Sequence, residues 1–454
     1  MALKQKIISQ IYDDQTGEVL NTEIIEDKAI KSPKSIEELG YNHEEQINLL
    51  QKIQDAFLGS QITIFPYPQS CPKCETKLYK KGKAKSTFNS VFTDHEIHLT
   101  AFRCINPDCK HVIELSLQGV FGDYRHPDLV EIQTKLAAEH SFVKAQELLR
   151  LQNKRHRSVN GQVNLKRITE KVGTCLAEIH QDKTSLDTKD IKDQSRLIVQ
   201  ADGGHIKDKH PDRSTFEAIL TTVYSPTNVE QKKSKSGCLK GEITQKSFAA
   251  SSFKDHHRSI KNMLLVSAMK EGLTKNTEVT AFADGAKNCW SIIKSLKSYC
   301  KSLECILDWY HIRVRFDKII KQMKSEYADK LESIKWKIWH GKSEEALERL
   351  TLMYGELITS DFADKLHQLL KYLANNKGYL VNYEARKIAG KPFTSSVIES
   401  AIETVVNARF KKKQKAQWNR ESAHRVLQIR TSVASNQWAK DWEQAKTKLY
   451  KKVA

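Results

Sequence analysis

The chain has 454 residues, of which 39% are hydrophobic and 28% charged, and this length is enough for about two to four globular domains. No apolar run approaches the ~20 residues that span a bilayer, and the N-terminus lacks the apolar segment of a signal peptide. We therefore expect a cytoplasmic protein with no membrane partner.

Positive charge is in excess and is unevenly distributed. The formal net charge is +19, which favours a polyanionic partner such as nucleic acid. Residues 405–454 contain 13 Lys or Arg against 3 Asp or Glu, so about half of the net charge lies in this last segment. The segment either contacts the polyanion or serves only as a solubilising tail.

Residues 1–60 are expected to form a hairpin followed by a helix. Apolar segments on either side of a Gly-containing turn predict two strands between Lys4 and Asp27. Ser35 is the expected N-cap of the helix, which should continue to Phe57. This part carries no chemical motif, so packing is its simplest role.

Residues 61–125 carry two cysteine pairs, one with a gap of two residues and one with a gap of four. The four cysteines are Cys71, Cys74, Cys104 and Cys109. Paired cysteines beside short strands are typical of a zinc ribbon, because tetrahedral Zn²⁺ binds four thiolates at about 2.3 Å. Four protein ligands leave no open position, so we expect a structural zinc ion. The alternative is four unligated thiols.

Residues 126–185 are expected to be helical. Apolar stripes predict helices within 129–137 and 141–149, and a third from Gly161 to Ile179. The connection before the third helix is polar and basic and contains Lys154, Arg155 and Arg157. Short helices joined by a basic connection are similar to a helix-turn-helix module, which places its last helix in a DNA groove. A plain helical bundle is the alternative.

The rest of the chain predicts an α/β core interrupted by helices. Apolar segments at 197–202, 215–224, 246–253, 279–283 and 305–307 predict strands, with helices after the third and the fourth. Residues 229–241 are rich in Lys, Ser and Gly and are expected to form a mobile loop of unassigned role. We assign the core to 195–311 and 392–430, an all-α insertion to 312–391 and a basic C-terminal helix to 431–454.

Acidic residues close three predicted strands, and another lies on a helix. Asp202, Asp284 and Asp308 end strands, and Glu399 lies on the amphipathic helix after the insertion. Open α/β sheets usually place their chemistry at such strand ends. Two Mg²⁺ ions bound by converging carboxylates can activate the attacking oxygen and stabilise the leaving oxygen of a phosphodiester. The alternatives are that the acids only cap helices, and that Glu403 takes the place of Glu399.

A basic strip follows the predicted Glu399 helix. Its members are Arg409, Lys411, Lys412, Lys413, Lys415 and Trp418. A basic surface beside the carboxylates would hold a polyanionic substrate, so we expect these residues to contact DNA.

The chain resembles the DDE transposases of bacterial insertion sequences from about residue 129 to residue 438. The resemblance is carried by Ala201-Asp202-Gly203, by Ala283-Asp284-Gly285-Ala286 with Trp290, and by Ser396-Val-Ile-Glu399-Ser400 with Arg409 and Trp418. The run Asp308-Trp-Tyr-His311 is similar to the C/D-x-x-H signature of Mutator-like transposases. In that superfamily a helical insertion precedes the catalytic Glu, as it would here.

The resemblance implies a ribonuclease H-like catalytic core. It implies that Asp202, Asp284 and Glu399 are ligands of two Mg²⁺ ions, for which Mn²⁺ can substitute. It also implies that Asp308 and His311 are an accessory pair, in which His311 contacts DNA or orients the scissile phosphate and Asp308 fixes it. The alternative for this pair is a helix cap and a histidine satisfied beside the sheet.

A protein of this kind would bind the terminal inverted repeats of its element, cleave phosphodiesters and join the 3′-OH ends to target DNA. It would act in the bacterial nucleoid as a homodimer or a higher oligomer. Two rival interpretations remain, namely a non-catalytic DNA-binding descendant and a nuclease that cuts without joining. The fold alone does not separate them.

Overall fold

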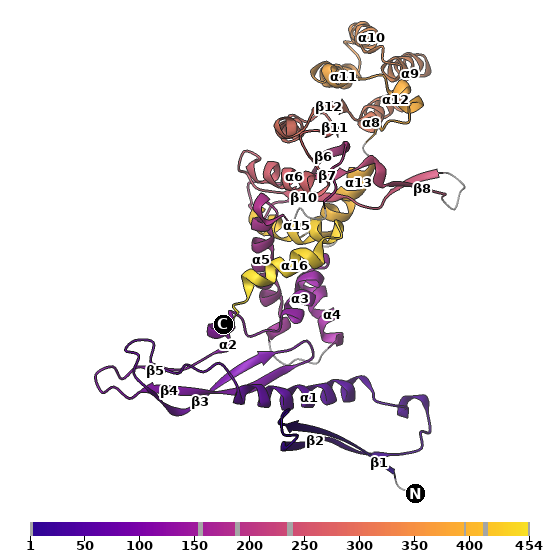
Figure 1. Ribbon diagram of the computed structural model, residues 1–454. Coiled ribbons are helices and arrows are strands. Elements are labelled where there is room, and N and C mark those ends of the chain that lie inside the picture. Colours follow the sequence, from indigo (N-terminus) through magenta and orange to yellow (C-terminus); the bar gives the residue numbers. More distant parts are fainter. Residues whose placement is uncertain are drawn as a thin grey trace. The chain divides into compact units, whose positions relative to one another are not determined.

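The structure is a computed structural model that describes residues 3–152, 158–186, 191–233, 239–394, 396–411 and 416–452 (Figure 1). The chain divides into two compact units, the first being Met1–Val172 with Trp442–Ala454 and the second Gly173–Asp441. One division falls within helix α5 (Gln162–Ile179) rather than in the polar connection that follows it. Across the described residues, no helix has the length and apolar character needed to cross a membrane.

The first unit begins with the expected hairpin and helix. Strand β1 (Leu3–Tyr12) pairs antiparallel with β2 (Val19–Ile30), and helix α1 spans His43–Thr63. The predicted helix start at Ser35 was wrong, because that side chain makes no capping hydrogen bond and precedes only a 3₁₀ turn. Asn42 is the N-cap, since its side chain accepts from the Glu45 amide while the Glu45 carboxylate accepts from the Asn42 amide.

A three-stranded antiparallel sheet follows in the first unit. Its strands are β3 (Leu78–Asn89), β4 (Asp94–Cys104) and β5 (Val112–Ile113), in that order, and a short helix α2 (Leu117–Phe121) comes next. The four cysteines lie at one end of this sheet, where the chain turns before β3 and between β4 and β5.

The three expected helices are present after this sheet. They are α3 (Pro127–Glu139), α4 (Phe142–Gln152) and α5. A cluster of buried apolar residues on all three, including Ala137, Leu149 and Leu165, packs them together. The basic residues Lys154, Arg155 and Arg157, predicted to bind DNA, lie outside the described residues.

The second unit contains a mixed five-stranded sheet. Its strands are β6 (Arg196–Lys207), β7 (Thr215–Tyr224), β10 (Ser247–Ser251), β11 (Glu278–Ala283) and β12 (Ser302–Leu307). Their order is β10-β7-β6-β11-β12; β7 runs antiparallel to both of its neighbours, β10 and β6, whereas β6, β11 and β12 run parallel. All five predicted strands are therefore present, and β6 lies at the centre of the sheet.

The two faces of β6 carry different side chains, because successive residues of a strand point to opposite faces. Leu197, Val199 and Ala201 belong to the main apolar core, together with residues of α6 (Arg258–Lys270) and α7 (Lys287–Ile293). Gln200 and Asp202 alternate with them and lie on the face that contacts α13 (Ser396–Ala401). Helix α15 (Arg420–Ala434) packs on the edge strand β10, and α16 (Trp438–Leu449) follows it.

The predicted mobile loop at 229–241 was wrong for the part that the structure describes. Strands β8 (Val229–Lys233) and β9 (Leu239–Ile243) pair antiparallel as a hairpin of their own (Figure 1). The Lys-, Ser- and Gly-rich composition concealed this, because a two-stranded hairpin can form without a run of core residues.

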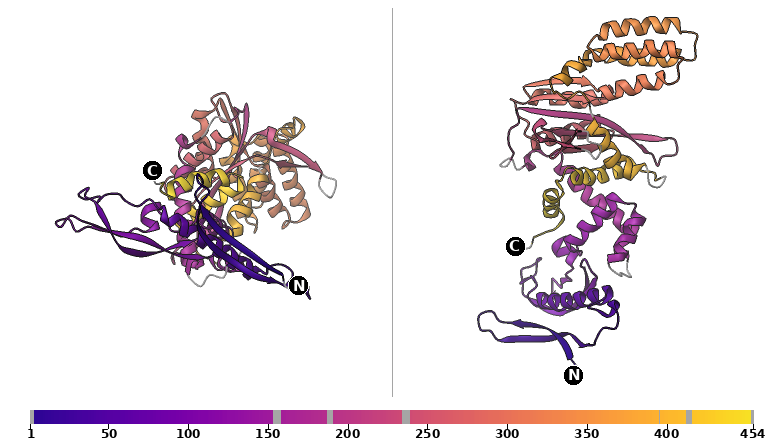
Figure 2. Two further views of the ribbon diagram at one scale, coloured as in Figure 1. Left: turned by 60° about the horizontal axis from the view of Figure 1, so that its bottom comes forward. Right: turned by 90° about the vertical axis from the view of Figure 1, so that its right-hand side faces the viewer.

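The expected helical insertion follows β12. Its helices are α8 (Trp309–Ile320), α9 (Ser325–Trp339), α10 (Ser343–Glu356), α11 (Ala363–Asn375) and α12 (Tyr383–Ile388). Helices α9, α10 and α11 lie side by side, as both views show (Figures 1 and 2). The aromatic rings of Trp309, Trp339 and Tyr383 pack against one another, and the Tyr383 hydroxyl donates to the Leu307 carbonyl over 2.7 Å. The insertion is thereby attached to the end of β12.

Candidate functional site

The first two predicted acids follow the last paired residues of two neighbouring parallel strands. Pairing between β6 and β11 ends at Ala201 opposite Ala283, so Asp202 and Asp284 come next on adjacent strands. The expectation that Asp202 ends its strand was wrong, because β6 continues to Lys207 through pairing with β7 alone. Asp202 thus lies inside a strand but at the point where its parallel pairing stops.

The turn after Asp284 is fixed by the helical insertion. Gly285 has φ +98°, and a Cβ atom there would lie 2.8 Å from Asn376 Nδ2 and 2.9 Å from Tyr372 Cε2. The Tyr372 hydroxyl donates to the Asp284 carbonyl over 2.9 Å, and the Asp284 side chain accepts from the Ala286 amide over 2.8 Å. Only glycine fits this close approach without strain, so α11 and the Asp284 turn form one packed unit.

Asp308 and His311 begin helix α8 at the end of β12. Asp308 is fully buried, and its Oδ1 accepts from the Tyr310 amide over 3.2 Å as the N-cap of the helix. Its Oδ2 lies 3.7 Å from His311 Nε2, one turn along the helix. The two interpretations of Asp308 are therefore compatible, since one oxygen caps the helix and the other faces the histidine.

Glu399 completes a compact group with this pair. Its Oε1 lies 3.6 Å from His311 Nε2, and ligand atoms of Asp308, His311 and Glu399 all lie within 4.8 Å of one another. Helix α13 then becomes a π-helix (Ile402–Asn407), a feature often found at functional sites. The rival acid Glu403 lies on that π-helix, is exposed, and accepts from Asn407 Nδ2 over 2.6 Å. The structure thus groups Glu399, and not Glu403, with the histidine.

A buried glutamine that the sequence analysis missed positions the Glu399 helix. Gln200 Oε1 accepts from the Ile398 amide over 3.0 Å, and Gln200 Nε2 donates to the Tyr224 hydroxyl over 3.3 Å. The first amides of a helix have no partner within it, so Gln200 satisfies one of them from the sheet. The signal was a polar residue in an apolar strand, two positions before Asp202 and hence on the same face.

The Asp284 and Asp308 carboxylates lie close enough to Asp202 to affect its pKa. Burial raises the pKa of Asp202 above its ordinary value of 3.8, and the Asp284 and Asp308 carboxylates raise it further. Opposing effects come from the hydrogen bond donated by the Gly203 amide, 2.8 Å long, and from His311. Asp202 and Asp284 are not members of the Asp308–His311–Glu399 group, but Asp202 interacts electrostatically with two of its residues.

The basic strip after Glu399 is partly buried. Helix α14 (Ala408–Phe410) carries Arg409, whose guanidinium carbon lies 4.7 Å from the centre of the Trp418 ring, and both side chains are buried. The Trp418 amide also donates to the Lys207 carbonyl over 3.0 Å. This burial argues against direct DNA contact by Arg409 and Trp418. Lys411 is exposed, and Lys412, Lys413 and Lys415 lie outside the described residues.

The four cysteines of the first unit form a group suited to zinc. The Sγ atoms of Cys71 and Cys109 are 3.8 Å apart, those of Cys74 and Cys104 are 3.4 Å apart, and all four lie within 4.8 Å. Tetrahedral zinc with bonds of ~2.3 Å requires sulfur separations of about 3.8 Å. Hydrogen bonds from Thr76 lower the pKa of the Cys74 thiol to about 6, whereas burial raises the pKa of the Cys104 thiol, so one thiolate is favoured before any metal binds. This cluster could hold a zinc ion.

Comparison with other proteins does not assign either site. No model of a known protein family and no curated protein matches the chain. The chemistry of the acidic site and of the cysteine cluster therefore has to be inferred from their own residues.

Proposed function

We propose that the protein is a DDE-type DNA transposase. The observation that carries the proposal is the grouping of Asp308, His311 and Glu399 beside the point where β6 and β11 stop pairing, with Asp202 electrostatically coupled to it. The chain order of three strands, helix, strand, helix and strand supports the ribonuclease H-like core that the sequence resemblance implies. The net charge of +19 supports a nucleic-acid substrate.

The donor set fits hard divalent cations. Asp202, Asp284 and Glu399 supply carboxylate oxygens, which Mg²⁺ and Mn²⁺ prefer. A bound cation would offset the burial, and the repulsion from Asp284 and Asp308, that raise the pKa of Asp202. Two such ions, when bound, would stabilise the reacting phosphodiester as Lewis acids and would lower the pKa of a water molecule.

The protein residues would then bind and orient the DNA. His311 Nε2 lies 3.7 Å from the buried, helix-capping Asp308 and 3.6 Å from Glu399, so two carboxylates constrain the same ring nitrogen. A constrained imidazole can donate a hydrogen bond to a non-bridging oxygen of the scissile phosphate. Hydrolysis and end joining are both in-line displacements at phosphorus, so one set of oriented residues can serve both steps.

The first unit would recognise the ends of the element. The proposal assigns end binding to the cysteine-bearing sheet and to helices α3 to α5, in the manner of a helix-turn-helix module. Pairing of two ends would require a dimer or a larger assembly.

Strand transfer by the purified full chain tests this proposal. DNA that carries the flanking ends of the element is incubated with Mg²⁺ and the wild type, the Asp284→Asn variant, or the control Asp329→Asn, which removes an exposed acid of α9. We expect joined products from the wild type and the control, and none from Asp284→Asn. Cleavage without joining would instead identify a nuclease. Binding without chemistry in all three proteins would identify a non-catalytic DNA-binding protein.

A further inference from the structure

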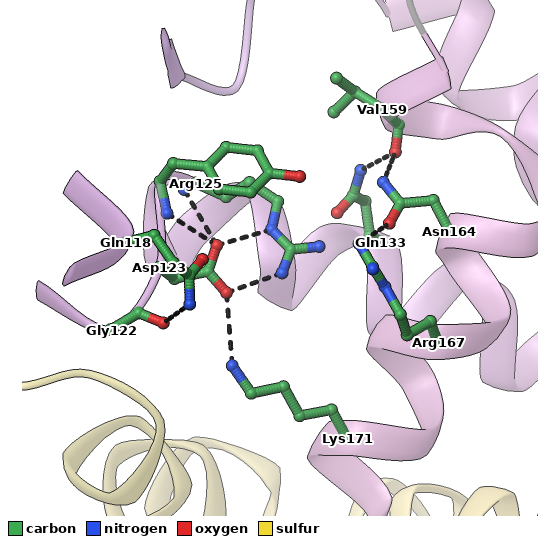
Figure 3. A network of polar contacts seen from close by, with 10 residues as sticks. Gln118, Gly122, Asp123, Arg125, Gln133, Val159, Asn164, Arg167 and Lys171 are labelled. Carbon is green, nitrogen blue, oxygen red and sulfur yellow. Dashed lines mark hydrogen bonds and ion pairs between the residues drawn. The ribbon is translucent and has the colours of Figure 1, made fainter. Parts of the chain in front are cut away.

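A cavity of about 330 Å³ lies in the first unit, and Figure 3 shows several of the residues that line it. Its walls come from α2, from the segment after it and from helix α5, and include Gln118, Asp123, Tyr124, Arg125, Arg167 and Lys171. Three of these side chains are cationic and one is anionic, so the lining carries an excess of two positive charges.

The base of the cavity is a buried two-bond ion pair. Arg125 Nε and Nη2 donate to the two oxygens of Asp123 over 2.8 and 2.6 Å, and both residues are only 6% exposed. The Asp123 carboxylate also accepts from the amides of Tyr124 and Arg125, and Lys171 Nζ lies 3.4 Å from it. These contacts fix the guanidinium plane before any ligand arrives.

One nitrogen of this guanidinium is left over. Within the described residues, Arg125 Nη1 is buried and has no hydrogen-bond partner. It points away from Asp123, toward the side on which Gln133 and Arg167 lie (Figure 3). A buried donor without an acceptor is unfavourable, so an acceptor from outside the chain would be favoured here once the side chains that cover Nη1 move aside.

The cations around Nη1 can donate to more than one oxygen of such an acceptor. Arg167 is exposed and uses Nη2 for a 3.0 Å hydrogen bond to Asn164, and Lys171 is half exposed. Arg167 and Lys171 lie on the same face of α5, one helical turn apart. An oxyanion with several oxygens, such as a phosphate, matches fixed guanidinium donors better than a single carbonyl does.

We propose that this cavity, the phosphate pocket, binds a backbone phosphate of nucleic acid through Arg125, Arg167 and Lys171. The nucleic-acid source of the phosphate rests on the proposed function, whereas the affinity for a phosphate oxyanion rests on the pocket alone. Contacts of this kind fix the position of a protein on a duplex without reading its sequence. The pocket would therefore anchor α5 on DNA of any sequence.

A pair of adjacent substitutions in the full-length protein tests the pocket. Arg167→Gln removes one of its cations, and Lys166→Gln removes an exposed charge from the neighbouring position of α5, outside the lining. Binding of a generic duplex is measured by fluorescence anisotropy as a function of salt. We expect Arg167→Gln to reduce the slope of log K against log salt by about one, and Lys166→Gln to change it less.

A second readout uses inorganic phosphate at constant ionic strength, with chloride as the reference. We expect phosphate to raise the melting temperature of the wild type and of Lys166→Gln more than that of Arg167→Gln. If neither readout separates the two variants, the phosphate pocket is refuted. If neither the wild type nor either variant binds DNA, but phosphate still raises the melting temperature of Arg167→Gln less than that of the other two proteins, the proposed function fails and the phosphate pocket stands.

Discussion

Gln200 is the side chain whose removal should show how the sheet positions Glu399. It is fully buried, and in Gln200→Leu the Ile398 amide, on a residue that is also buried, would lose the acceptor that Gln200 supplies from the sheet. Leaving a buried amide unsatisfied costs about 1–3 kcal/mol. Since about 1.4 kcal/mol is a factor of ten, local opening of the α13 segment should become roughly 5- to 150-fold more frequent.

Hydrogen exchange, followed by mass spectrometry over residues 397–407, measures this opening directly. Thr222→Val is the matched control, because Thr222 lies opposite Gln200 on β7, is equally buried, and has no hydrogen-bond partner for its hydroxyl within the described residues. We expect faster exchange and weaker DNA cleavage only in Gln200→Leu. Equal exchange in the two variants would refute the positioning role of Gln200.

Three further predictions follow from the cysteine cluster and from two buried titratable groups. Cys74→Ser should lose zinc by elemental analysis and expose the β3–β5 sheet to exchange, and full zinc retention would contradict the cluster as its site. Because burial raises the pKa of Asp202, its charge destabilises the fold at about pH 7, so Asp202→Asn should raise the melting temperature there. The gain in melting temperature should vanish below pH 3.8, the ordinary pKa of an aspartate, because Asp202 is then neutral in both the folded and the unfolded protein. A difference in melting temperature that stays constant with pH would contradict this prediction. Burial lowers the pKa of His424, stacked 3.7 Å from Phe253, to about 4, so the folded protein should lose up to roughly 3 kcal/mol as pH falls from 6.5 to 4. His424→Phe should lack this loss in urea titrations, and parallel pH profiles would disprove it.

Elements with a strong local pattern could be predicted from the sequence. The five strands of the main sheet and the helices of the insertion follow from apolar periodicity, and the four cysteines follow from their spacing. The strand-end acids could be named because each comes directly after an apolar segment, and Glu399 because it lies on an amphipathic helix. The grouping of Asp308 and Glu399 around His311 could not be predicted from local patterns, since it depends on which elements are neighbours.

Long-range pairing explains the errors within the sheet. Gly203 and Gly204 follow Asp202 and are typical of a turn, but β7 pairs with both residues and keeps them in β6. The hairpin of β8 and β9 was missed for a related reason, because cross-strand hydrogen bonds can hold a strand of poor intrinsic propensity.

Buried polar side chains explain the remaining differences. A basic residue is expected at the surface, yet Arg409 is buried because Trp418 covers its guanidinium. Asp123 and Arg125 are charged residues that are buried as a mutual ion pair, which their surrounding sequence does not indicate. These are the positions at which the structure adds most to the sequence.

Strand transfer by Glu399→Gln and Glu403→Gln tests the proposed site most directly. The two residues lie one turn apart in sequence, but only Glu399 lies beside His311. Loss of an outer-shell partner of a metal site costs about 10- to 100-fold, so loss of a ligand should cost more than ~100-fold. We therefore expect Glu399→Gln to lose joining by more than that factor while it still binds DNA, and Glu403→Gln to keep joining. Retained joining in Glu399→Gln, or its loss only in Glu403→Gln, would contradict the site.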